Sequence, residues 1–166
     1  MKDCKKAECA INIINKFQWF TSPFLLLGVR LYVAWIFFKS GKLKLDYYLQ
    51  DNWDTVIYLF EEEHPVILRK DIAESLGVEP IQFLSAENAA VMGTAGELVF
   101  SVLLAFGLGG RFAALALLFM IGVIEFTYKA LPEHDMWALL ALVILVFGAG
   151  KFSIDYIIRH FFSKEK

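Results

Sequence analysis

Residues 88–110, NAAVMGTAGELVFSVLLAFGLGG, and residues 112–131, FAALALLFMIGVIEFTYKAL, decide the fold of this chain. A helix on the surface of a soluble protein shows a polar face at a period of about 3.6 residues. Residues 98–110 and 112–124 have no such face. A helix needs roughly 20 mostly apolar residues to cross a bilayer. The two stretches therefore predict membrane-spanning helices.

Two more stretches have the same character, at residues 17–38 and from residue 136 onward. With them, the sequence predicts an all-α, polytopic membrane protein with four transmembrane helices in one bundle. We expect the spans at about residues 21–40, 86–108, 111–131 and 136–156. Residues 41–84 then form an extramembrane loop, and residues 1–166 form a single membrane domain. Apolar residues at helical spacing before the first span predict a short amino-terminal interfacial helix.

The composition excludes several classes of protein. Hydrophobic residues make up 58% of the chain, which is incompatible with intrinsic disorder. Its 16 basic and 18 acidic residues give a net charge of −2, so no basic surplus is available for nucleic acid. The expected partner is the lipid bilayer. Cys4 and Cys9 lack the spacing of a dithiol or zinc site, and we interpret Glu61-Glu62-Glu63-His64 as a solvated acidic turn. No metal site is predicted.

Charged residues inside the predicted spans are the strongest functional signal. Such residues cost about 2.5–3.5 kcal/mol each at the bilayer centre. At a rise of about 1.5 Å per residue, Arg30 and Glu97 lie at a similar depth, so we predict that they form an ion pair. Glu125 lies higher, with Lys39 and Lys42 above it. The five side chains would form one polar column, which either fixes helix register or forms a functional polar pocket.

His134 and Trp137 lie three residues apart, just before the fourth predicted span. A tryptophan at this position is usually an interfacial anchor. A histidine beside it can hydrogen-bond a quinone carbonyl or carry protons. Haem needs axial ligands inside the bundle, whereas His64 and His160 fall in a loop and in the tail. The sequence therefore shows no haem signature, and it shows no flavin motif.

Orientation follows from the lysines and arginines outside the spans. With four spans, both termini lie on one side of the membrane. More lysines and arginines fall on that side than on the other, where they are diluted by the acidic loop. Positively charged loops remain in the cytoplasm. We therefore expect both termini to be cytoplasmic.

An ordered set of short motifs between about residues 20 and 160 resembles a known family. The motifs are Arg30-Leu31, Phe38-Lys39-Ser40-Gly41-Lys42, Leu59-Phe60-Glu61, His64-Pro65-Val66, Ala89-Ala90, Glu97, Gly107-Leu108-Gly109-Gly110-Arg111, Ala113-Ala114-Leu115, His134, Trp137-Ala138, Gly148-Ala149-Gly150-Lys151 and Ser153-Ile154-Asp155. This set resembles the DoxX family of bacterial inner-membrane proteins. One position departs from the family pattern, because His64 follows Glu63 where an aromatic residue is usual.

The resemblance carries its own expectations. The DoxX family is named through its relation to the small membrane subunit of thiosulfate:quinone oxidoreductase, and it is otherwise linked to thiol and oxidative-stress redox systems. The resemblance therefore implies a bacterial inner-membrane location, a four-helix bundle with an Arg–Glu core, and a quinone-linked redox subunit. It supplies no catalytic residue.

Three functions fit these residues. In the first, which we favour, the polar column and the rim bind a quinone, and the protein passes electrons from a sulfur donor or a partner protein. In the second, the protein is a non-catalytic membrane anchor or scaffold for partner proteins. In the third, it carries a small solute or protons as a homo-oligomer. The residues predicted to contact the quinone are Arg30, Lys39, Lys42, Glu97, Glu125, His134 and Trp137.

Overall fold

The structure is a computed structural model that describes residues 2–62, 67–79, 82, 84–127 and 132–163. Regular secondary structure in this part of the chain is all helical, as predicted, apart from an isolated antiparallel bridge between Ile67 and Gln82. The helices are α1 (Lys2–Leu49), α2 (Trp53–Glu62), α3 (Lys70–Leu76), α4 (Ala86–Phe106), α5 (Gly110–Thr127), α6 (Pro132–Phe147) and α7 (Ile154–Ser163).

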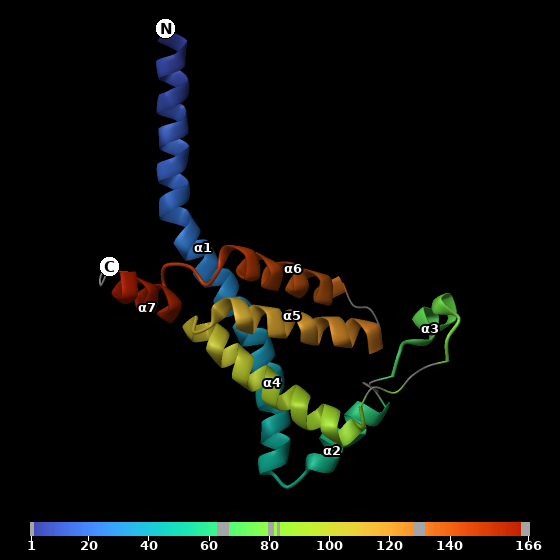
Figure 1. The fold of residues 1–166 in the computed structure, drawn as a ribbon. Coiled ribbons are helices and arrows are strands. Elements are labelled where there is room, and N and C mark those ends of the chain that lie inside the picture. Colours follow the sequence, from blue (N-terminus) through green and yellow to red (C-terminus); the bar gives the residue numbers. More distant parts are fainter. Residues whose placement is uncertain (1, 63–66, 80–81, 83, 128–131, 164–166) are drawn as a thin grey trace.

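Four of these helices form a bundle (Figure 1). Helix α1 packs against α4, α4 packs against α5, and α5 packs against α6. Helix α2 lies against α4 beside the carboxyl end of α1, and α3 lies farther out on the connection to α4. The amino-terminal part of α1 projects beyond the other helices (Figure 1).

The bundle core is built on repeats of three and four residues. In α4 the buried positions include Ala90, Thr94, Glu97, Ser101 and Leu104. This spacing keeps one narrow seam of each helix facing its neighbours, as in a coiled coil. The apolar core comprises Val33, Ala34, Phe37, Leu104, Ala113, Ala114, Leu117, Ile121 and Ile144.

The distribution of polar and apolar residues is inverted relative to a soluble protein. Large apolar side chains such as Trp35, Phe112 and Phe119 are exposed, whereas Arg30 and Glu97 are buried. In water, charged residues are almost never fully buried, and contiguous apolar surface is small. The α1 segment Ile11–Leu49 and helices α4 and α5 are long and apolar enough to cross a membrane. The protein is therefore an integral membrane protein.

The fourth predicted span is shorter than expected. We predicted a helix over 136–156, but α6 ends at Phe147. Gly148 and Gly150 adopt φ values of 84° and 81°, a left-handed conformation that glycine accepts without steric cost. The chain turns there and begins again as α7. Helix α6 has 16 residues, or about 24 Å of length, against a hydrocarbon core of about 30 Å.

The prediction of a short interfacial helix at the amino terminus was wrong, because this segment is part of α1. Residues 2–49 form one continuous helix, although Pro23 lies inside it. Proline removes one backbone hydrogen bond, a loss that membrane helices tolerate because nearby groups compensate. The same helix also runs nine residues beyond the predicted end of the first span at residue 40. The predicted loop 41–84 therefore begins as helix and also contains α2 and α3.

Candidate functional site

Arg30 lies at one end of the bundle and holds the turn between α6 and α7. Its side chain is buried, with the residue only 2% exposed. Nη1 donates a hydrogen bond to the Ala149 carbonyl and Nη2 donates one to the Phe152 carbonyl, each at 2.7 Å. Gly107 lies directly against the guanidinium, because a Cβ there would be 2.5 Å from Nη1. Arg30 thus fastens this turn to α1.

Asp155 completes the same end of the bundle. Its two carboxylate oxygens accept hydrogen bonds from the backbone N–H groups of Gly109 and Gly110, at 2.8 Å each. These N–H groups lie at the start of α5, where a carboxylate is favoured by the helix dipole. The backbone N–H of Asp155 donates to the Gly107 carbonyl at 3.0 Å. The charged side chains at this end are therefore bound mainly to backbone groups.

Glu97 does not pair with Arg30, so the predicted Arg–Glu ion pair was wrong. Its partner is Lys44, whose Nζ lies 2.7 and 2.8 Å from the two carboxylate oxygens. The Lys44 ammonium also lies 5.5 Å from the centre of the Phe60 ring. The prediction ended the first helix near residue 40, whereas α1 continues far enough to bring Lys44 to the face that contacts α4.

A sequence signal for Lys44 existed. Arg30, Phe37 and Lys44 are separated by seven residues, the spacing that returns to the same face of a packed helix. Lys39 and Lys42 fall outside this series and are exposed. The predicted single polar column therefore does not form. In its place the bundle has an Arg30 site, a Lys44–Glu97 site and a third site at its other end.

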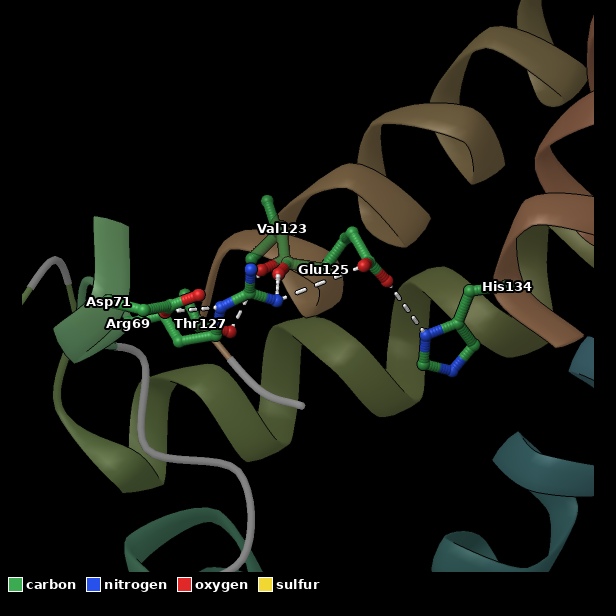
Figure 2. Close-up of polar contacts among 6 residues, drawn as sticks. All are labelled: Arg69, Asp71, Val123, Glu125, Thr127 and His134. Atoms are coloured by element: carbon green, nitrogen blue, oxygen red, sulfur yellow. Dashed lines mark hydrogen bonds and ion pairs between the residues drawn. The ribbon is translucent and has the colours of Figure 1, made fainter. Parts of the chain in front are cut away.

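The third site joins Glu125 of α5 to His134 of α6 (Figure 2). The Nδ1 atom of His134 lies 3.2 Å from Glu125 Oε2. From the opposite side, Arg69 approaches Glu125, donating to its main-chain carbonyl at 3.0 Å and lying 3.9 Å from Oε1. The backbone N–H of Arg69 also donates to the Phe126 carbonyl at 3.0 Å. Arg69 was not among the predicted site residues, because no local pattern places a loop residue on the end of a distant helix.

His134 is the most enclosed group of this third site. The residue is 7% exposed, and its ring lies 5.3 Å from that of Trp137, as the predicted pairing of these two residues required. Trp137 in turn meets Phe37 of α1 at 6.2 Å in an edge-to-face contact. Nε2 of His134 has no hydrogen-bond partner in the described part of the chain, and Figure 2 shows it directed away from Glu125.

Asp71 forms the exposed edge of this site. Its carboxylate accepts a hydrogen bond from Arg69 Nε at 2.7 Å. The adjacent guanidinium lowers the pKa of Asp71 below its ordinary value, chiefly through this hydrogen bond. Among the described residues, no group of three or more His, Cys, Asp or Glu side chains is placed to hold a metal ion. Glu63 and His64 of the predicted acidic turn lie outside the described residues.

Comparison with known proteins identifies the family. The DoxX family model matches residues 25–130, which include Arg30, Lys44, Glu97 and Glu125. A protein of Haemophilus influenzae, described only as an uncharacterized protein, is 27% identical over 169 residues, which cover 96% of this chain and 92% of the relative. No solved structure matches the chain significantly. The family model covers well over half of the sequence, and the chain therefore belongs to the DoxX family of membrane proteins.

Proposed function

We propose that this protein is a quinone-binding subunit of a redox system in the bacterial inner membrane. In this proposal the quinone head group binds at His134. The observation that carries the proposal is a buried histidine with one ring nitrogen on a carboxylate and the other without a partner among the described residues. It lies beside aromatic rings at the end of an apolar bundle.

The chemistry of the pair suits a quinol–quinone couple. A carboxylate at Nδ1 favours the tautomer with the proton on that nitrogen, so that neutral His134 presents Nε2 as an acceptor. Nε2 can then take a proton from a quinol hydroxyl, and Glu125 stabilises the imidazolium that forms. The imidazolium N–H can donate to the carbonyl of the resulting quinone. In this oxidation the proton of the second quinol hydroxyl passes to water on the exposed Glu125 side of the site, and both electrons pass to an acceptor partner protein; reduction of a quinone by a donor partner runs the same steps in reverse.

The proposed quinone site contains fewer residues than the seven predicted from the sequence. Glu125, His134 and Trp137 lie together and are retained. Arg30 and Glu97 are engaged by other partners within the bundle, and Lys39 and Lys42 are exposed elsewhere on α1. The remaining polar sites are interpreted as supports of the bundle.

Quinone binding can be measured through Trp137. The other three tryptophans, Trp19, Trp35 and Trp53, would be replaced by phenylalanine, and the protein would be titrated with a short-chain quinone analogue in mild detergent. We expect saturable quenching of the Trp137 fluorescence. Because buried hydrogen bonds to charged groups are worth about 1.5–3 kcal/mol, His134→Asn and Glu125→Gln should each weaken binding about tenfold or more.

The control for these variants is His160→Asn. His160 is an exposed histidine on α7, stacked on Tyr156. This variant should bind the quinone analogue like the parent protein. Quenching that does not saturate, or that is equal in the His134, Glu125 and His160 variants, would contradict the proposal. A folded protein that binds no quinone would favour the membrane anchor for partner proteins.

We also propose that the chain crosses the membrane four times, with α6 as the fourth span and both termini in the cytoplasm. The support is a contact between the amino-terminal half of α1 and the turn after α6, because Lys151 Nζ lies 3.8 Å from the centre of the Trp19 ring. Segments that meet on one side require an even number of crossings. Cys4 and Cys9 should react with a membrane-impermeant maleimide only after the membrane is opened. Labelling of intact spheroplasts would contradict this orientation.

A further inference from the structure

We infer that the turn between α6 and α7 forms a binding site for a phosphate-bearing anion. The site is a groove of about 440 Å³ between α1, this turn, α7 and Arg111 near the start of α5. Its polar lining comes from Ser22, Arg111, Lys151, Ser153, Asp155, Tyr156 and Arg159. The groove lies at the Arg30 end of the bundle and is independent of the proposed quinone site.

The groove has an excess of positive charge. Arg111, Lys151 and Arg159 face one acidic residue, Asp155. Both oxygens of the Asp155 carboxylate already accept N–H groups at the start of α5. This carboxylate is therefore committed to the fold, and the three cations retain hydrogen-bond donors for a ligand. Phosphate oxygens are the natural acceptors for such donors.

Two of the cations are held in place. Arg111 Nη2 donates to the Val146 carbonyl at 3.2 Å, at the carboxyl end of α6, and its other N–H groups have no partner among the described residues. Lys151 is positioned over the indole of Trp19, a cation–π contact that uses the ring face and leaves the ammonium N–H groups free to bond elsewhere. Arg159 lies one helical turn from Asp155 on α7. The groove is thus preorganised by the turn that Arg30 fastens.

The surroundings of the groove are apolar. Phe24 of α1 and Phe152 of the turn contact each other at 5.2 Å, and both are exposed. Phe147 and Ile158, which line the groove itself, are exposed as well. A basic groove bordered by exposed apolar side chains suits a phospholipid, whose phosphate is charged and whose chains are apolar. A free phosphate or phosphate ester shares the charged chemistry without the chains.

The experiment compares lipids in a thermal unfolding assay of the whole protein in detergent. Phosphatidylglycerol should raise the unfolding temperature more than phosphatidylcholine, and inorganic phosphate at the same concentration tests the soluble source. A cation near a lipid headgroup contributes about a fivefold factor in affinity. Arg111→Gln, Lys151→Gln and Arg159→Gln should therefore each weaken phosphatidylglycerol binding by about fivefold.

The matched control is Lys70→Gln, which removes one exposed cation from α3, away from the groove. It should leave the effect of phosphatidylglycerol unchanged. A shift with inorganic phosphate that the three groove variants abolish identifies a soluble phosphate compound as the ligand. Equal shifts with both lipids and none with phosphate would overturn the proposal. So would a response to phosphatidylglycerol that survives replacement of all three cations in a folded protein.

Discussion

The two ends of the bundle use buried polar groups in opposite ways. At one end, Arg30 donates to two backbone carbonyls of the turn after α6, and Asp155 accepts from two backbone N–H groups at the start of α5. At the other end, His134 and Glu125 meet through their side chains, and Arg69 donates to the Glu125 carbonyl at 3.0 Å and lies 3.9 Å from its Oε1. Arg30 and Asp155 thus hold backbone segments together, although Arg30 Nε has no hydrogen-bond partner among the described residues, whereas the His134–Glu125 contact joins two titratable side chains.

The difference shows how a buried charge can be assigned to structure or to chemistry. A charge whose donors end on backbone carbonyls supports the fold, since removing it leaves those carbonyls unsatisfied. A carboxylate–histidine pair that is 32% and 8% exposed at its side chains, with an unpartnered ring nitrogen in the described part of the chain, retains the capacity to exchange a proton. Burial alone does not separate these two cases, but the identity of the partner atoms does.

The largest effect on stability is expected for Arg30→Leu. The substitution leaves the Ala149 and Phe152 carbonyls without donors, at a cost of about 3 kcal/mol in the free energy of unfolding. Unfolding in a graded mixture of detergent and denaturant measures it. Since Arg30 and Glu97 share no partner, the loss in an Arg30→Leu, Glu97→Leu double variant should equal the sum of the single losses. If the double variant were more stable than this sum predicts, Arg30 and Glu97 would have to interact directly.

A smaller effect is expected at the middle of the bundle. Lys44→Leu leaves the buried Glu97 carboxylate without its partner, and Glu97→Leu leaves the half-buried Lys44 ammonium without one, so each should cost about 2 kcal/mol. The double variant should recover at least half of the combined loss. Lys42→Leu is the matched control, since Lys42 is exposed two residues away, and it should change stability by about 0.5 kcal/mol or less. Additive losses in the Lys44 and Glu97 variants would contradict the pair.

The smallest effect is expected for Asp71→Asn, at the exposed edge of the site formed by Arg69, Glu125 and His134. Arg69 lowers the pKa of Asp71 below the ordinary value of 3.8, so the ionised carboxylate stabilises the fold at neutral pH. This contribution is lost as the pH falls through the lowered pKa. The difference in unfolding temperature between the parent and Asp71→Asn should therefore shrink below about pH 4. Glu74→Gln on the same helix α3 serves as the control. If this difference in unfolding temperature did not change with pH, the Arg69–Asp71 ion pair would contribute nothing to the stability of the fold.

Much of the fold follows from local pattern. The all-round apolar character of residues 98–110 and 112–124 predicted membrane helices there, and α4 and α5 confirm it. The expectation that Arg30 and Glu97 are buried was also correct. Their predicted pairing was wrong because they lie at different depths: Arg30 contacts Gly107 at the carboxyl end of α4, whereas Glu97 contacts Lys44, about 21 Å farther along α1. The seven-residue series places Arg30 and Lys44 on the same face of α1, so position along the helix decides which of the two meets Glu97.

The sequence by itself determined that this chain is a helical membrane protein with charged residues inside its apolar segments. The length of an apolar segment and the cost of burying a charge within it depend only on local composition. The sequence also placed His134 beside Trp137, because residues three positions apart lie on the same face of a helix. Only the tertiary structure decided that Lys44 reaches Glu97, that Arg30 fastens the turn at residues 148–153, and that Arg69 joins Glu125. Those contacts join residues 53, 119 and 56 positions apart, and their geometry is set by the packing of whole helices.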